Sequence, residues 1–158
     1  MEKKLELLRF FLVLALMAVP FYLILKLEPY FWDVQVFTAS NVYVLLLVLG
    51  FQPVQQGYFI FVMGKGLEVA AACVGWRSVL AFLALLVATP GKRNPAGGLA
   101  LIPILYGFNI FRLATSLLTN VFAQNLFDIV HGFLWTYSMT FLVLGLWWYW
   151  VGVRKSWA

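Results

Sequence analysis

Four long apolar runs divide the chain, and short polar or charged segments separate them. The runs cover residues 7–27, 76–90, 99–119 and 129–151. A helix rises about 1.5 Å per residue, so about 20 apolar residues cross the ~30 Å hydrocarbon core of a bilayer. The pattern predicts an all-α polytopic membrane protein with about four transmembrane helices. No internal repeat or linker interrupts it, so residues 1–158 are expected to form a single membrane domain.

Two segments between the first and second runs do not match a spanning helix. The apolar stretch 42–51 is too short to cross a bilayer, which predicts a re-entrant or interfacial helix. Residues 58–73 are rich in aromatic and β-branched side chains, and Gly64-Lys65-Gly66 interrupts them with a sequence suited to a tight turn. We expect this segment to form a small extracytoplasmic β-hairpin that packs over the helices.

Composition supports a membrane protein and excludes a nucleic-acid-binding one. The chain is 64% hydrophobic and 11% charged, whereas a soluble domain averages about 45–50% and 25%. Lipid must therefore be the solvent for most of the surface. The net charge of +5 comes from short basic clusters beside the apolar runs, as expected for anchoring at an anionic leaflet. No basic stripe is interleaved with aromatic residues.

The basic clusters also predict how the chain is oriented in the cell membrane. Lysine and arginine concentrate in cytoplasmic loops, and the three clusters are separated by spans. If all three are cytoplasmic, both termini lie inside, and the acidic residues lie toward the extracytoplasmic side. The clusters are Lys3, Lys4 and Arg9; Lys92 and Arg93; and Arg154 and Lys155, and the acidic residues are Glu28, Asp33, Glu68 and Asp128.

Ionisable residues inside the apolar runs are costly in a bilayer and need a reason. Arg112 lies within the third run, and Asn109, three residues earlier, shares its helical face. His131 opens the last run, and Asp128, three residues earlier, is placed to orient one ring nitrogen. In the predicted orientation, both pairs lie near the outer leaflet.

The single cysteine, Cys73, stands where the second run begins. A helix N-terminus and the nearby Arg77 both favour a thiolate, and Gly75 permits a close backbone approach. Three helices thus deliver a thiol, a guanidinium and an imidazole to one depth. Each also has a structural interpretation: Cys73 as a packed apolar residue, Arg112 as a tether to Asp128 or to carbonyls, and His131 as a partner of a neighbouring carbonyl.

Three short segments resemble those of the exosortase/archaeosortase family. Ala72-Cys73-Val74-Gly75 resembles the family's Ala-Cys-Ser-Gly segment, Asn109-Ile110-Phe111-Arg112 resembles its Asn-x-x-Arg segment, and His131-Gly132 resembles its histidine segment. The order is also the same, and the resemblance covers about residues 45–150. Val74 departs from the usual small hydroxyl residue. The chain is short beside many exosortases, which suggests an archaeosortase-like member.

The resemblance implies a membrane-embedded cysteine protease or transpeptidase of the cell membrane. Its substrates would be secreted precursors with a C-terminal motif, a transmembrane helix and a basic tail, and a membrane lipid would be one acceptor for the cut C-terminus. Cys73 would attack the carbonyl, His131 would transfer the proton, and Arg112 would stabilise the oxyanion. Asn109, Asp128, Arg77 and Gly75 would support these three residues.

Two other functions remain open from the residues alone. In a non-catalytic membrane assembly or scaffold protein, the same three polar side chains would only tie helices together. An intramembrane protease would use them to release a peptide to water. No cofactor is expected, and one histidine with one cysteine cannot supply a zinc shell.

Overall fold

The computed structural model describes residues 2–89 and 95–156, which are mostly helical. The α-helices are α1 (Glu2–Leu16), α2 (Ala18–Leu27), α3 (Trp32–Val48), α4 (Trp76–Ala88), α5 (Pro95–Leu99), α6 (Ile102–Phe122) and α7 (Trp135–Ser156). Shorter helical turns are η1 (Glu28–Tyr30), η2 (Ala71–Cys73), η3 (Gln124–Leu126) and the π-helical η4 (Ile129–Leu134). The strands are β1 (Val54–Gln56), β2 (Phe59–Val62) and β3 (Lys65–Glu68).

Three helical segments among the described residues are long and apolar enough to cross a membrane. They are Lys4–Tyr30, Ala96–Phe122 and Gln124–Gly152, and they correspond to the first, third and fourth predicted spans. The second predicted span, 76–90, contains the 13-residue helix α4, which by itself covers about 20 Å; residue 90 lies outside the described part. Length and composition therefore support three spans, with α3 and α4 as shorter apolar helices.

The helix predicted over 42–51 proves to be only the second half of α3. This helix has 17 residues and begins at Trp32. Its polar first half escaped prediction because residues such as Gln35 and Asn41 find partners from distant parts of the chain: Gln35 donates to the Val69 carbonyl, and Asn41 donates to the Tyr106 hydroxyl.

The predicted hairpin is present and carries a third strand. The antiparallel sheet has the order β1-β2-β3, with Ile60 opposite both Gln55 and Leu67. The β2–β3 turn lies at Met63-Gly64, so the expected turn at residues 64–66 was placed too late. Both turn residues have positive φ, 50° and 78°, as a two-residue type I′ turn requires.

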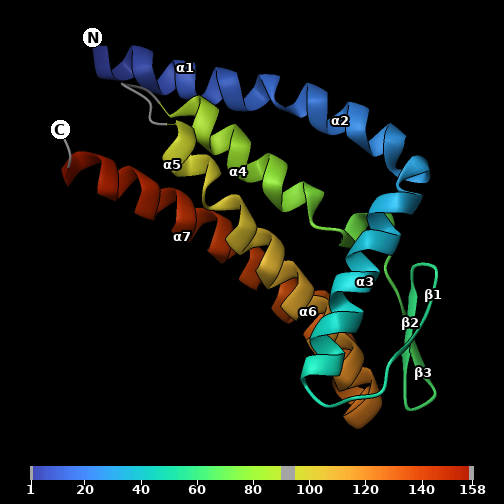
Figure 1. Ribbon diagram of the computed structural model, residues 1–158. Helices are drawn as coiled ribbons and strands as arrows, with labels where there is room; N and C mark the ends of the chain where they lie inside the picture. Colours follow the sequence, from blue (N-terminus) through green and yellow to red (C-terminus); the bar gives the residue numbers. More distant parts are fainter. Residues whose placement is uncertain (1, 90–94, 157–158) are drawn as a thin grey trace.

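Two apolar cores hold the elements together, one near each end of the molecule. Ile60 and Val62 of β2 are buried with residues of α3 and α6, so the sheet packs on these helices. Phe82 of α4, Leu105 of α6 and Val143 of α7 belong to the second core. In Figure 1, the start of α1, the end of α4 and the end of α7 gather at one end, and α3 and the sheet lie at the other.

From residue 10 to residue 25, α1 and α2 carry only apolar and aromatic side chains, on every side of the helix. The most hydrophobic window of Lys4–Tyr30 contains no buried residue, and large side chains such as Leu8 and Phe11 are exposed. A helix that is apolar all round requires an apolar solvent. The structure is therefore that of a membrane protein. Of the predicted basic clusters, Lys92 and Arg93 lie outside the described residues.

The buried face of the sheet should dominate its stability. Replacing the fully buried Ile60 with alanine (Ile60→Ala) leaves a cavity in the core, so we expect a loss of about 2–4 kcal/mol in the free energy of unfolding. The control Val54→Ala changes an exposed residue of the same sheet and should cost less than about 0.5 kcal/mol. Unfolding of the detergent-solubilised variants measures both, and equal losses would contradict the burial of β2.

Candidate active site

Cys73 ends the short helix η2 and stands two residues before Gly75, which caps the N-terminus of α4. The thiol is free and partly exposed. Gly75 has a φ of +91°, a left-handed conformation that other residues adopt at a cost. A Cβ on Gly75 would also lie 3.1 Å from the Asn109 Cγ. Glycine is therefore needed both for the turn and for the close approach of α6.

Asn109 joins the cysteine segment to α6. Its side chain is 1% exposed, and its Nδ2 donates a 2.9 Å hydrogen bond to the Cys73 carbonyl oxygen. The Asn109 Oδ1 is buried and has no hydrogen-bond partner in the described structure. The amide thus fixes the position of the cysteine and keeps one acceptor unused.

Arg112 follows one turn later on the same helix. Its Nε is buried without a partner, and no ion pair to its guanidinium is found within residues 2–89 and 95–156. Arg112 lines the same cavity as Asn109 and Gly75. An unpaired guanidinium in an apolar helix is costly, so a structural tether to Asp128 does not explain it.

His131 lies in the π-helical segment η4 and faces α6. Its Nδ1 is 3.2 Å from the Ser116 Oγ, and its ring stacks on Phe127 with 5.1 Å between centroids. Ser116 is fully buried and therefore well placed to orient the ring. Asp128, which the sequence predicts to orient a ring nitrogen, is not a hydrogen-bond partner of the ring within the described residues; Ser116 takes that place.

One face of α6 therefore organises all three predicted catalytic residues. Asn109 holds the Cys73 segment, Ser116 holds the His131 ring, and Arg112 lies between them. Asn109 and Ser116 are two helical turns apart, about 10 Å along the axis. A direct hydrogen bond between thiol and imidazole is not present in the described residues, and such contacts commonly tighten only when a substrate binds.

Ser116 is the functional candidate that sequence reasoning missed. A serine in an apolar helix is common, and nothing adjacent to it in the chain points to a site. The signal was its spacing: Asn109, Arg112 and Ser116 recur every three to four residues, which places them on one helical face. A polar stripe of this kind identifies the face that the other site elements approach.

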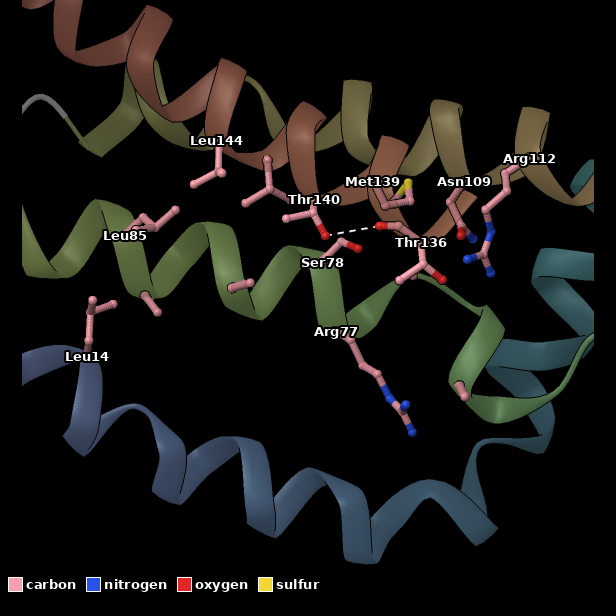
Figure 2. Close-up of a pocket in the computed structure, with 15 residues that line it drawn as sticks. Leu14, Arg77, Ser78, Leu85, Asn109, Arg112, Thr136, Met139, Thr140 and Leu144 are labelled. Carbon is pink, nitrogen blue, oxygen red and sulfur yellow. Dashed lines mark hydrogen bonds between the residues drawn. The ribbon is translucent and has the colours of Figure 1, made fainter. Parts of the chain in front are cut away.

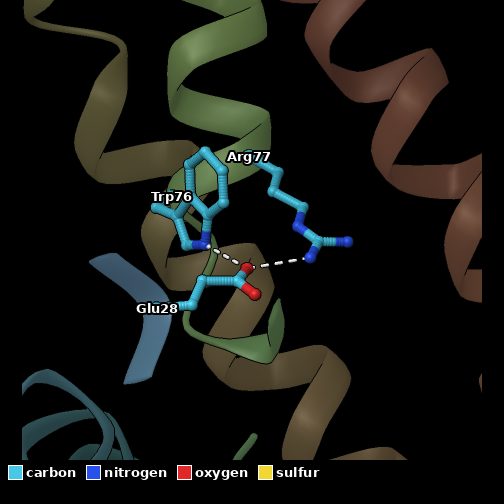
Figure 3. A network of polar contacts seen from close by, with 3 residues as sticks. All are labelled: Glu28, Trp76 and Arg77. Atoms are coloured by element: carbon cyan, nitrogen blue, oxygen red, sulfur yellow. Dashed lines mark hydrogen bonds and ion pairs between the residues drawn. The ribbon is translucent and has the colours of Figure 1, made fainter. Parts of the chain in front are cut away.

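Arg77 has a different partner from the one expected. Its guanidinium forms a 2.8 Å ion pair with Glu28, which also accepts a 3.2 Å hydrogen bond from the Trp76 indole (Figure 3). The carboxylate offsets the charge of Arg77, so the support that Arg77 lends to a thiolate is weaker than the sequence suggests. The contacts instead join η1 to the start of α4, next to Cys73.

A cavity of about 560 Å³ begins beside the cysteine segment. Asn109, Arg112 and Arg77 line its polar end, and Figure 2 shows the Asn109 and Arg112 side chains lying next to each other there. Leu85 and Leu144 line its apolar part. Cys73 and His131 are not among its lining residues, and the cavity reaches the cysteine segment at Ala72 and Gly75. It is therefore suited to a ligand with a polar segment beside Asn109 and Arg112 and an apolar continuation. Among the described residues, no cluster of three His, Cys, Asp or Glu side chains is present to hold a metal.

Comparison with known proteins gives one match. A family model described as transmembrane exosortase matches residues 2–150, which include every residue of the site. No curated protein and no solved structure matches the chain.

Two glycine substitutions should differ in their effect on the stability of the protein. Gly75→Ala places a Cβ in a left-handed backbone and against Asn109, so we expect a loss of about 1–2 kcal/mol in unfolding free energy together with slower alkylation of Cys73. Gly107→Ala has open space around its Cβ within α6 and should be neutral or slightly stabilising. Thermal unfolding and iodoacetamide labelling measure the two effects. A Gly75→Ala variant as stable and reactive as the native protein would refute the predicted close contact.

Proposed function

The chain belongs to the transmembrane exosortase family, and on this premise we propose that it is a membrane cysteine transpeptidase acting through Cys73, Arg112 and His131. Exosortases are in general cysteine peptidases or transpeptidases that act on sorting signals. The observation that carries the assignment is the α6 face, which holds the Cys73 segment and the His131 ring on either side of an unpaired arginine.

The first half-reaction forms a thioester and releases an amine. The Cys73 sulfur forms a bond to the carbonyl carbon of the substrate as His131 takes the thiol proton. The carbonyl electron pair moves to the oxygen, which Arg112 stabilises through charge-assisted hydrogen bonds. When the carbonyl re-forms, the carbon–nitrogen bond breaks and His131 returns the proton to the leaving amine.

The second half-reaction transfers the acyl group. An acceptor amine or hydroxyl attacks the thioester carbon, and its proton passes through His131 to the departing Cys73 sulfur. The free thiol is restored, and the new C-terminus is joined to the acceptor. Membrane lipids offer such groups at the interface. Water in the same position would give a free carboxylate, which is the product of the peptidase alternative.

The substrate that suits this site is a secreted precursor with a C-terminal motif, a transmembrane helix and a basic tail. The cavity has a polar end at Asn109 and Arg112, next to the cysteine segment, and an apolar part between helices, which suits a chain that passes from the interface into lipid. A cytoplasmic basic tail then requires the sheet and α3 to face the extracytoplasmic side and both termini to be cytoplasmic. This orientation needs the short helix α4 to make a fourth crossing, because three crossings alone would put the termini on opposite sides; in Figure 1 the start of α1 and the end of α7 lie at the same end. The charge distribution of the sequence favours this orientation.

The scaffold alternative is less well supported by the same contacts. A helix tether gains from pairing its charge, but Arg112 forms no ion pair in the part of the chain that is described. An unpaired guanidinium that lines a cavity instead suits a group that meets a ligand.

Substituting the three proposed catalytic residues should abolish processing in the source cells. We expect Cys73→Ala, Arg112→Leu and His131→Ala each to lower precursor cleavage by at least about 100-fold, because each removes a group used in the transition state. Mass spectrometry of the accumulated precursors and of the modified C-termini measures this effect. Near pH 7, iodoacetamide should label Cys73 quickly in the native protein and slowly in the Arg112→Leu and His131→Ala variants.

The matched control is Thr119→Val. Within residues 2–89 and 95–156, the Thr119 hydroxyl donates its hydrogen bond to the Thr115 carbonyl of its own helix and to no residue of the site, so processing and labelling should persist. If Cys73→Ala cells still process their precursors, Cys73 is not the nucleophile. A new C-terminus that carries only a free carboxylate would identify a peptidase in place of a transferase.

Single cysteines test the proposed orientation. In a Cys73→Ser background, Met63→Cys places a thiol in the exposed β2–β3 turn, and Ala96→Cys places one in α5 at the other end. A membrane-impermeant maleimide should label the Met63→Cys variant in intact cells and the Ala96→Cys variant only after permeabilisation. Labelling of both from the same side would refute the proposed orientation.

A further inference from the structure

We propose that Asn109 binds the peptide backbone of the substrate beside the bond that Cys73 attacks. Its nitrogen fixes the cysteine segment, and its oxygen accepts a backbone N–H group of the substrate. The inference rests on the proposed function and deepens it. It names the chemical group recognised at the polar end of the cavity: the backbone N–H and C=O of a residue in a non-helical segment.

The orientation of the Asn109 amide follows from its partner. The Cys73 carbonyl oxygen can only accept a hydrogen bond, so the Asn109 Nδ2 must face it, as the 2.9 Å contact shows. The Oδ1 then points away from the cysteine segment. This oxygen is buried and has no donor among the described residues, although buried amide oxygens are normally paired. A ligand with an N–H group would satisfy it.

Arg112 supplies the complementary unpaired group. Its Nε is a buried donor without a partner, it lies one turn from Asn109, and both residues line the polar end of the cavity (Figure 2). One free acceptor beside one free donor matches the N–H and C=O of a single residue in an extended segment, because these two groups point to the same side of the chain. A phosphate has oxygen acceptors and would leave the Asn109 oxygen unpaired. The pair therefore favours peptide backbone over a lipid phosphate.

The same requirement restricts the conformation of the substrate. Inside an α-helix, each backbone N–H is already bonded to the carbonyl four residues earlier. Only an extended segment or the first turn of a helix has free N–H groups. The bound residue must therefore lie at or before the first turn of the substrate helix. The helix itself continues toward the apolar lining, which includes Leu85 and Leu144.

Paired alkylating reagents test this role without turnover. N-ethyl iodoacetamide carries an N–H and a C=O, whereas ethyl iodoacetate has a similar size and reactive carbon but lacks the N–H. The rate ratio of the two reagents on Cys73 is divided by their ratio on N-acetylcysteine methylamide in the same detergent. We expect the native protein to favour the amide reagent by a further three- to tenfold, about the effect of one hydrogen bond.

Two substitutions separate the roles of the two Asn109 atoms. Asn109→Leu removes both and should return the rate ratio to that of the free thiol. Asn109→Asp keeps an acceptor oxygen and loses the donor to Cys73, so it should retain the amide preference while both absolute rates fall. Thr119→Val, on the same helix, should keep the native ratio and rates. Thermal unfolding confirms that each variant is folded.

A native ratio equal to that of the free thiol overturns the inference, as does an amide preference that survives Asn109→Leu. Neither result depends on the proposed function, which is judged by precursor processing in Cys73→Ala cells. Processing that needs Cys73 without an amide preference would refute the role of Asn109 alone. An amide preference without Cys73-dependent processing would refute the transpeptidase alone.

Discussion

Inside a bilayer, every polar side chain must find a partner or destabilise the protein, and this constraint explains the arrangement of the site. α6 is a largely apolar span that carries Asn109, Arg112 and Ser116 on one face. Two of them form hydrogen bonds to groups of other elements, the Asn109 nitrogen to the Cys73 carbonyl and the Ser116 hydroxyl to the His131 ring. These hydrogen bonds also determine where the thiol and the imidazole lie, so stability and site geometry depend on the same contacts.

The remaining elements hold the cysteine segment from other directions. The Glu28 carboxylate binds both Trp76 and Arg77, so it joins the end of the first span to the start of α4. On the other side, Val69, which follows β3, is fully buried in the core that includes residues of the sheet and α3, and Cys73 packs against this core. Gly75 allows this chain to turn directly against Asn109. A thiol on a flexible loop would lack such positioning, which catalysis by proximity requires.

The groups that have no partner are informative for the same reason. The Asn109 oxygen and the Arg112 Nε are buried at the end of one cavity and unsatisfied in the described structure. Native proteins rarely keep such groups without a use. Their combination of an acceptor and a donor connects the mechanism to substrate recognition, because the backbone N–H and C=O of one extended residue can satisfy both beside the cysteine segment.

The sequence alone determined the membrane class, the presence of a hairpin and the order of Cys73, Arg112 and His131. It predicted about four spans, and three of them are long enough in the structure to cross a bilayer. These features depend on hydrophobic run length, bilayer thickness and local turn chemistry, all of which are local properties of the chain. Only the tertiary structure decided that α3 begins at Trp32, that Arg77 pairs with Glu28 and that Ser116 orients His131. Each of these depends on a contact between residues of different elements. Hydrophobic patterning carries no information about which polar groups will form hydrogen bonds or ion pairs.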